Sequence, residues 1–255
     1  MSEIFGFERG ESVLIIGLGR SGLACAEVLS QFGVTLYATD EESERRLEEA
    51  IATAQRFGAR FVAPAQLGSI LGAIDCAVLS PGVGPTSPVV RSLYEFNVPV
   101  LGEIELAYRL CSAPIIAVTG TKGKSTTTAL IGHLLRASGR EVRVGGNIGN
   151  PLIEEAAVAE ASDWVVAEVS SFQLESIRSF KPKISALINI SPDHLDRYFS
   201  MDEYAEAKFR IFANQNAGDT FVGNLDDDRI GALAEGEGAA RVKCRALWYS
   251  REPHR

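Results

Sequence analysis

The sequence has no excess of positive charge. Its 255 residues include 25 Lys and Arg against 33 Asp and Glu, which gives a formal net charge of −8. Proteins that bind nucleic acids or anionic membranes concentrate Lys and Arg on one face. We therefore expect neither kind of partner, and we expect any bound anion to be held by local geometry.

Long apolar runs are also absent, and cysteine is scarce. No run reaches the roughly eighteen apolar residues of a membrane-spanning helix, and the first residues, MSEIFGFERGE, lack the basic and apolar regions of a secretory leader. The four cysteines have no metal-ligand spacing and lie mostly in apolar stretches, as in proteins of a reducing compartment. These absences predict a cytoplasmic protein without membrane insertion.

Short β-rich runs alternate with helical stretches almost from the start of the chain. Alternation of this kind predicts an α/β fold in which a parallel sheet is covered on both faces. The segment CSAP, at 111–114, interrupts the pattern. We therefore expect a Rossmann-like domain at 1–110 and a P-loop-type ATP-binding domain at 111–255. The expected strands are 13–16, 34–38, 76–79, 98–101, 115–118, 142–144, 164–168, 184–190 and 220–222, and the expected helices include 21–32 and 103–110.

The first expected domain opens with GLGRSG, in which Gly17, Gly19 and Gly22 lie between a strand and a helix. Glycines in that setting allow a tight turn and bring a diphosphate close to the helix N-terminus. Asp40 ends the second strand, where its carboxylate could accept from a ribose or a base. The pattern indicates a nucleotide or diphosphate pocket, an NAD site being one version. The alternative is a tight turn without a ligand.

The second expected domain opens with TGTKGKST, a shortened phosphate loop. The common pattern has a glycine five positions before the Gly-Lys pair, and Val118 stands there instead. Backbone N–H groups of such a loop converge on a polyphosphate, a lysine neutralises it and a hydroxyl ligates Mg²⁺. This predicts an ATP site at Gly120, Thr121, Lys122, Gly123, Lys124, Ser125 and Thr126, with Lys124 on the β- and γ-phosphates and Ser125 on the metal.

Four stretches together carry a family resemblance. The stretches are TGTKGKST, GGNIGNP at 145–151, EVSSFQLE at 168–175 and SPDHLDRY at 191–198. Together they resemble the Mur ligase superfamily, and within it the D-glutamate-adding ligases of bacterial peptidoglycan synthesis. The superfamily also includes the folylpolyglutamate synthases. Lys122 departs from the Mur pattern, because asparagine is commoner there and lysine is commoner in the folate enzymes.

The resemblance implies two Mg²⁺ ions in the second domain. Glu168 and Ser125 would hold one ion between the ATP phosphates, and His194, flanked by Asp193 and Asp196, would ligate the other. Lys208, in a helix expected to begin with a capping box at 200–203, would be carbamylated and would complete that second site. Taken alone, Glu168 reads as a solvated carboxylate or helix cap, His194 fits a surface residue and a ligand equally well, and Lys208 reads as a surface residue. The implied catalytic residues are Lys124, Glu168, His194 and Lys208.

The resemblance also implies the substrates and the reaction. The first domain would bind the UDP end of UDP-N-acetylmuramoyl-L-alanine, and an acyl phosphate made with ATP would react with D-glutamate. The implied substrate-binding residues are Gly19, Arg20, Ser21, Asp40, Ser80, Pro81, Gly82, Gly146, Asn147, Ser170 and Gln173, with Ser171 a weaker candidate. Two other readings stay open: a folylpolyglutamate synthase-like ligase and a nucleotide-binding module without turnover. Family members continue into a third domain that supplies the amino-acid site. We therefore expect a chain that is truncated and inactive alone. Separately, we expect a monomer and no further motif after about residue 232.

Overall fold

The computed structural model describes residues 10–84 and 86–252. The chain divides into two compact units on either side of the bond between Leu110 and Cys111, and each unit is described by itself. Residues 1–9, where the sequence predicts no leader, and residues 253–255 lie outside the described part. Within that part, none of the helices is both long and apolar enough to cross a membrane.

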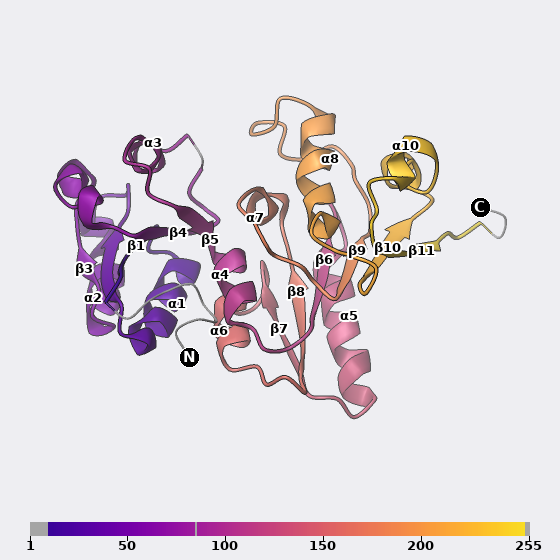
Figure 1. Ribbon diagram of the computed structural model, residues 1–255, viewed down its shortest axis with the longest axis horizontal. Coiled ribbons are helices and arrows are strands. Elements are labelled where there is room, and N and C mark those ends of the chain that lie inside the picture. The colour runs from indigo at the N-terminus through magenta and orange to yellow at the C-terminus, as the bar shows by residue number, and fades with distance from the viewer. Residues whose placement is uncertain (1–9, 85, 253–255) are drawn as a thin grey trace. The chain divides into compact units, whose positions relative to one another are not determined.

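The first unit is a five-stranded parallel sheet with the strand order β3-β2-β1-β4-β5 (Figure 1). Its strands are β1 (Ser12–Ile16), β2 (Thr35–Thr39), β3 (Arg60–Phe61), β4 (Cys76–Leu79) and β5 (Val100–Gly102). Its helices are α1 (Arg20–Leu29), α2 (Glu44–Arg56), α3 (Pro88–Glu95) and α4 (Glu103–Leu110), with 3₁₀ turns at Ser30–Phe32, Pro64–Ser69 and Leu71–Ala73.

The central strand β1 is buried on both faces. Leu14 and Ile16 pack in one cluster with Leu93 of α3. Val13 and Ile15 alternate with them and point to the opposite face, and both are 0% exposed. Burial on both faces explains why this strand is a continuous apolar run rather than an alternating one.

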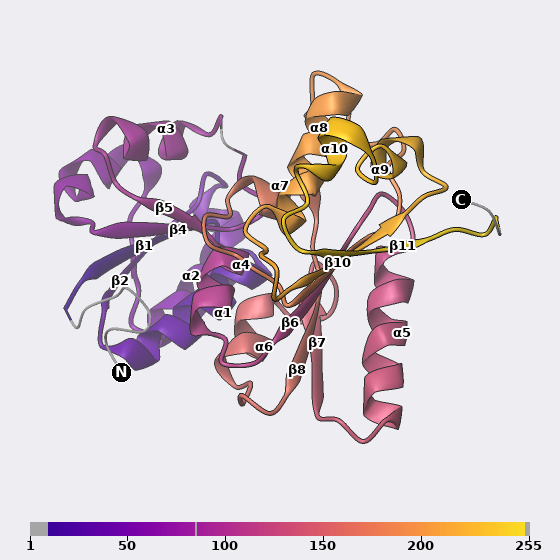
Figure 2. The same cartoon turned by 45° about the vertical axis from the view of Figure 1, so that its right-hand side comes forward.

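The second unit is a six-stranded parallel sheet with the strand order β11-β10-β9-β6-β8-β7 (Figure 2). Its strands are β6 (Ile115–Thr119), β7 (Val142–Gly146), β8 (Trp164–Glu168), β9 (Ile184–Leu187), β10 (Thr220–Asn224) and β11 (Arg245–Tyr249). Its helices are α5 (Lys124–Ala137), α6 (Leu152–Ala157), α7 (Ser171–Glu175), α8 (Met201–Phe209), α9 (Asp228–Gly231) and α10 (Gly236–Ala239), with a 3₁₀ turn at Arg210–Phe212.

The two parallel sheets confirm the expected α/β class, and several elements differ from expectation, among them the short strand β3, which was not expected. Helix α3 was not expected between β4 and β5. Strand β9 ends at Leu187 rather than 190, because the Ile188 carbonyl and the Ile190 N–H bond to the side chains of Asn224 and Asp227 and not to the backbone of a neighbouring strand. Strand β11 was also not expected: it is a half-exposed edge strand that pairs with β10, and it lies in the stretch after residue 232, where no further motif was expected.

Because every strand pair is parallel, the carboxyl ends of the strands share one edge of each sheet. Ligands of open α/β sheets bind at that edge. In the first unit the β1–α1 turn, Asp40 and Ser80 follow the ends of β1, β2 and β4. In the second unit the loop after β6, Glu168 at the end of β8, and the segment after β9 share the corresponding edge.

Candidate active site and family

The turn between β1 and α1 depends on glycine at two positions. Gly17 has a φ angle of +88°, and a Cβ atom at Gly22 would lie 1.8 Å from the carbonyl oxygen of Gly17. A side chain at either position would force the backbone to move. The N-cap, Gly19, has open space at its Cβ position, followed by exposed Arg20 and half-buried Ser21. The first-turn N–H groups of α1 have no acceptor within the helix, which suits an anion.

Asp40 and Ser80 lie beside this turn and stabilise it. Asp40 Oδ2 accepts from the Leu18 N–H at 2.7 Å, and Oδ1 accepts from the Glu42 N–H at 2.9 Å. The Ser80 hydroxyl donates to the Gly17 carbonyl at 2.8 Å. Pro81, half-buried, and Gly82, exposed, follow Ser80. The structure thus brings the residues expected around a UDP group to one end of the sheet, and it gives Asp40 a role in holding the turn that its position in the sequence did not reveal.

The phosphate loop, residues 120–126, joins β6 to α5. Gly120 and Gly123 have φ angles of +154° and +81°. Lys124 begins α5, and its Nζ donates to the Thr121 carbonyl at 3.0 Å, while Ser125 is exposed on the first turn. Thr126 and Lys122 are also exposed. The loop therefore presents a helix N-terminus, a lysine and hydroxyl groups together, whereas the N–H groups of Thr121 and Lys122, expected to face a phosphate, bond to Asn189.

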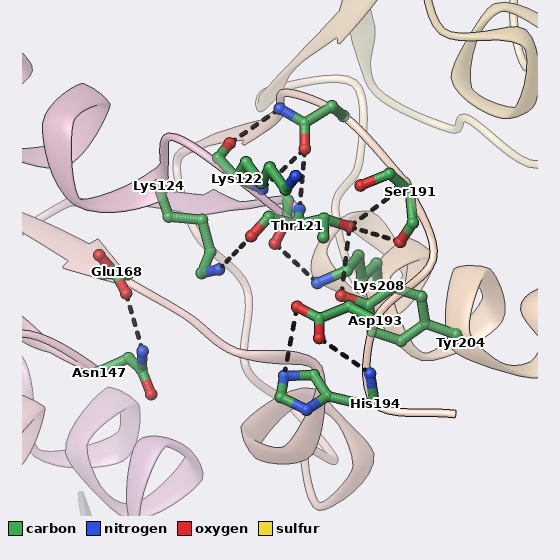
Figure 3. Close-up of polar contacts among 12 residues, drawn as sticks. Thr121, Lys122, Lys124, Asn147, Glu168, Ser191, Asp193, His194, Tyr204 and Lys208 are labelled. Atoms are coloured by element: carbon green, nitrogen blue, oxygen red, sulfur yellow. Dashed lines mark hydrogen bonds and ion pairs between the residues drawn. The ribbon is translucent and has the colours of Figure 1, made fainter. Parts of the chain in front are cut away.

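Glu168, at the end of β8, is 1% exposed. Asn147 Nδ2 donates to its Oε1 at 2.8 Å (Figure 3). Gly146, which precedes Asn147, has a φ angle of +108°, and a Cβ there would lie 2.3 Å from the Glu168 carbonyl. Glycine is therefore needed for β7 and Asn147 to approach Glu168 closely. The solvated-carboxylate reading of Glu168 is wrong.

Lys208, in α8, is also 1% exposed, so its reading as a surface lysine is wrong. Its Nζ donates to the Gly120 carbonyl at 2.8 Å and lies 4.5 Å from the centre of the Tyr204 ring. Burial, and secondly the charge of Lys124, lower the pKa of Lys208 to about 7, against the opposing effect of Asp193. A buried amine with this pKa is available in its neutral, nucleophilic form near neutral pH.

His194 lies in the segment between β9 and α8, in a left-handed conformation with a φ angle of +53°. Its backbone N–H donates to Asp193 Oδ1 at 3.0 Å, and its Nε2 lies 3.7 Å from Asp193 Oδ2. Its ring centre lies 4.8 Å from that of Phe172. In the view of Figure 3, Asp193, His194 and Lys208 lie on one side of Lys124, and Glu168 and Asn147 lie on the other. Asp196 is exposed.

The donors that surround the phosphate loop fit Mg²⁺ in part. Among residues 10–84 and 86–252, no three His, Cys, Asp or Glu side chains gather as a metal cluster. Mg²⁺, however, commonly binds through one or two carboxylates together with substrate phosphates. Glu168 Oε2 is buried and has no hydrogen-bond partner among the described residues, and with the Ser125 hydroxyl it suits one such ion. Lys208 lacks an acceptor as it stands and fits a metal only after modification.

Ser170 and Gln173 form a capping box at the start of α7. Ser170 Oγ accepts from the Gln173 N–H at 3.3 Å, and Gln173 Oε1 accepts from the Ser170 N–H at 2.9 Å. Ser171 begins the helix and is buried. The motif SSFQLE therefore has a local structural basis that spacing alone could have revealed.

The expected capping box at the start of α8 is present only by half, since Glu203 Oε2 accepts from the Phe199 N–H rather than from that of Ser200.

The sequence analysis did not single out two residues at this site. Tyr204 OH lies 3.2 Å from Thr121 Oγ1, so α8 contacts the phosphate loop directly. Asn189 hydrogen-bonds to Thr121 and Lys122. Asn189 stands two residues before the SPDHLDRY stretch, inside the range 184–190 that was expected to be strand, so no local signal set it apart.

Comparisons with known proteins identify the family. The family described as Mur ligase middle domain matches residues 118–254, and the family described as Mur ligase MurD-like, N-terminal domain matches residues 11–102. The first match alone covers more than half of the chain. The chain belongs to the Mur ligase family. Both matches agree with the resemblance read from the four motifs.

Curated relatives of this Mur ligase are similar to it over both units. The UDP-N-acetylmuramoylalanine--D-glutamate ligase of Thermoanaerobacter pseudethanolicus is 43% identical over 244 residues, which are 96% of this chain and 53% of the relative. The protein of the same name from Trichlorobacter lovleyi is 45% identical over 227 residues, 89% of this chain and 51% of the relative. The chain spans about half the length of the curated relatives it matches.

Solved structures agree on the fold of this Mur ligase. The UDP-N-acetylmuramate:L-alanyl-gamma-D-glutamyl-meso-diaminopimelate ligase from Neisseria meningitides has a TM-score of 0.61 at 17% identity, covering 94% of this chain and 78% of that one. The MurF ligase from Thermotoga maritima, in complex with ADP, has a TM-score of 0.51 at 16% identity, covering 85% and 47%. At these identities the likeness concerns the fold alone.

Proposed function

We propose that this Mur ligase adds D-glutamate to UDP-N-acetylmuramoyl-L-alanine with consumption of ATP, as a step of peptidoglycan synthesis. The observation that carries the proposal is the identity of 43% to a ligase of that name, over 96% of this chain. The phosphate loop, with Lys124 at the N-terminus of α5, supplies a matching nucleotide site. The match of residues 11–102 to a MurD-like domain favours this substrate over a folate, in spite of Lys122.

The proposed reaction has two chemical steps. A carboxylate oxygen of the L-alanine residue attacks the γ-phosphorus of ATP, which forms an acyl phosphate and releases ADP. The amine of D-glutamate then attacks the acyl carbon, an amide bond forms, inorganic phosphate leaves and the amine nitrogen loses a proton. The first step brings two anions together, so positive charge must screen them at close range.

In this proposal the chain's own residues bind and orient the nucleotide. The Lys124 ammonium neutralises the β- and γ-phosphates, and the first-turn N–H groups of α5 donate to phosphate oxygens. Ser125 and Glu168 hold one Mg²⁺, which when bound adds charge screening beside the phosphates. Asn147 fixes the orientation of Glu168 through its 2.8 Å hydrogen bond, so that Oε2 is the oxygen left for the cation.

We further propose that Lys208 is carbamylated. Neutral Nζ would attack the carbon of CO₂, an N–C bond would form and one proton would be released, which converts a cation into a carboxylate-like group. The support is the burial of Lys208 beside the phosphate loop and its Nζ contact with the Gly120 carbonyl. With His194, the modified side chain would hold the second Mg²⁺.

Binding and turnover measurements test the proposed function. The chain is titrated in a calorimeter with UDP-N-acetylmuramoyl-L-alanine and, separately, with dihydrofolate, each with and without Mg²⁺ and ADP. We expect saturable binding of the UDP compound and none of the folate. Preferential folate binding would overturn the assignment. With ATP and D-glutamate added, a version that contains the rest of the ligase should release ADP only when the UDP compound is present. Light scattering tests our further expectation of a monomer, and we place the reaction in the bacterial cytoplasm.

A further inference from the structure

The side chain of Asn189 is bonded to two consecutive residues of the phosphate loop. Its Oδ1 accepts from the N–H groups of Thr121, at 3.0 Å, and Lys122, at 2.8 Å. Its Nδ2 donates to the Lys122 carbonyl at 2.8 Å. The Asn189 backbone carbonyl also accepts from the Thr121 N–H, at 2.9 Å. One carboxamide therefore binds the loop from a position 67 residues further along the chain.

These bonds determine which part of the loop is left for a ligand. In a longer phosphate loop, backbone N–H groups along the loop cradle the phosphates. Here the N–H groups of Thr121 and Lys122 already have an acceptor within the protein. The N–H groups of Gly123, the N-cap of α5, and of the first turn that follows remain for an anion. Asn189 thus acts as the acceptor for the first half of this shortened loop.

The segment that carries Asn189 is itself held from three sides. Asn224 Nδ2 donates to the Ile188 carbonyl at 3.0 Å, and Asp227 Oδ2 accepts from the Ile190 N–H at 2.6 Å. Thr121 Oγ1 accepts from the Ser191 N–H at 3.0 Å. The carboxamide therefore stands on a backbone that strand β10, the start of α9 and the loop itself fix in place.

We propose that Asn189 is a positioning residue of the phosphate loop. It sets Thr121 and Lys122 before nucleotide arrives, so that Lys124 and the N–H groups that follow Gly123 are already aimed at the β-phosphate. The role needs an acceptor for two N–H groups and a donor for a carbonyl in one planar group, and only a carboxamide combines these. This inference rests on the proposed ATP-dependent function.

The first test needs no nucleotide. Amide hydrogen exchange is followed by NMR for the wild-type chain, Asn189→Ala and the matched control Asn214→Ala. Asn214 Nδ2 likewise bridges two backbone carbonyls of the second unit, those of Arg178 and Phe180. In the wild type we expect the amides of Thr121 and Lys122 to be protected. Asn189→Ala should speed the exchange of the Lys122 amide at least about tenfold. The Thr121 amide keeps the Asn189 backbone carbonyl as an acceptor and should change less, and Asn214→Ala should leave both unchanged.

The second test measures Mg²⁺-dependent binding of ADP and of AMP by calorimetry. We expect Asn189→Ala to weaken ADP about tenfold or more and to leave AMP, which lacks a β-phosphate, nearly unchanged. ADP affinity equal to that of the wild type would overturn the positioning role, and so would an equal loss in Asn214→Ala. A wild-type chain that does not bind ADP would contradict the proposed function, while the exchange of the two amides would still decide whether Asn189 sets the loop.

Discussion

Asn147 donates a hydrogen bond to one oxygen of Glu168, and the other oxygen, Oε2, is buried without a hydrogen-bond partner in the part of the chain that the structure describes. An unpaired buried acceptor costs on the order of 1–3 kcal/mol, and more when it is charged. That cost is borne at the end of β8, next to the phosphate loop. A cation bound there would remove it.

The first prediction is that Glu168→Gln stabilises the chain without Mg²⁺ and abolishes the effect of Mg²⁺ on ADP binding. The amide keeps an oxygen for Asn147 and removes the unpaired charge, so we expect the melting temperature to rise by a few degrees, or roughly 1 kcal/mol. Calorimetric melting with and without MgCl₂ and ADP measures both effects.

Glu175→Gln is the matched control for this prediction. Both carboxylate oxygens of Glu175 have partners, Tyr198 OH and Arg197 Nη2, so this variant should lose stability. If Glu168→Gln melted below the wild type without Mg²⁺, or kept the Mg²⁺ effect, Oε2 would not be the cation ligand.

The second prediction is that Lys124→Ala weakens the binding of ADP but not the binding of UDP-N-acetylmuramoyl-L-alanine. Lys124 belongs to the second unit and the glycine turn to the first. ADP binding should therefore weaken at least about tenfold, through loss of a charged hydrogen bond, while UDP-N-acetylmuramoyl-L-alanine affinity stays within about twofold. Calorimetry measures both. Lys183→Ala, at the opposite end of β9 from the loop, is the control that should change neither. Equal weakening of both ligands would contradict the assignment of the ATP phosphates to Lys124 and of the UDP group to the first unit.

The third prediction concerns three glycines of the first unit. Gly22→Ala would place a methyl group 1.8 Å from a backbone oxygen, so it should destabilise the chain by several kcal/mol, on the order of 3. Gly19→Ala meets no atom within 4 Å and should fold normally, yet its methyl group stands where the ligand diphosphate would approach. We expect it to weaken the UDP compound about tenfold or more.

Gly68→Ala also meets no atom within 4 Å and is the control that should change neither stability nor affinity. Thermal melting and calorimetric titration of the three variants check the prediction. Undiminished ligand affinity in Gly19→Ala would show that the helix N-terminus does not face the diphosphate.

The fourth prediction follows from the lowered pKa of Lys208, which is about 7 against 10.5 for an unburied lysine. Between these values the unfolded chain binds a proton that the folded chain does not, so the free energy of unfolding rises with pH. Below about 7 both states are protonated and the folded chain bears the full cost of a buried cation. Lys208→Met should therefore be more stable than the wild type at pH 6, and its advantage should shrink by pH 9.

Urea unfolding in CO₂-free buffer from pH 6 to 9 checks this. Lys124 and Asp193, the charged groups that act on Lys208, remain in both proteins. Lys243→Met, at an exposed lysine, should show a difference from the wild type that does not vary with pH. A stability difference for Lys208→Met that is the same at pH 6 and pH 9 would contradict the prediction.

Local patterns predicted much of the fold. Strands with continuous apolar runs, such as β4 and β8, were predicted at their observed ends, because burial on both faces leaves a plain signature. Strand β11 was not predicted, because an edge strand is half exposed and its pattern is weak. Helix α3 follows a Pro/Gly loop, and its Ser87 cap and Pro88 at the first position were the signals passed over.

The site shows where prediction from sequence must stop. The role proposed for Lys124 depends on its position at the start of a helix that follows a strand and can be read locally, whereas the role proposed for Glu168 came from the family resemblance. The bond of Asp40 to the Leu18 N–H and the burial of Lys208 depend on segments that are distant in sequence and meet only in the fold. No spacing rule encodes such meetings. The resemblance to a family pointed to Lys208, and the structure supplied the physical reason that this lysine differs from a surface one.

The central strand β6 pairs with β9, a strand that lies 68 residues further along the chain, so that Ile116 is opposite Ile184. Closing a chain loop of that length lowers the conformational entropy of the chain, and this loss comes before the strand pairing can stabilise the fold. The phosphate loop obtains its bonds to Asn189 and Ser191 only once that pairing exists. At translation rates of roughly 5–20 residues per second, several seconds separate the synthesis of the loop from that of the segment that holds it. The ordered form of the phosphate loop is thus acquired late in the folding of the second unit.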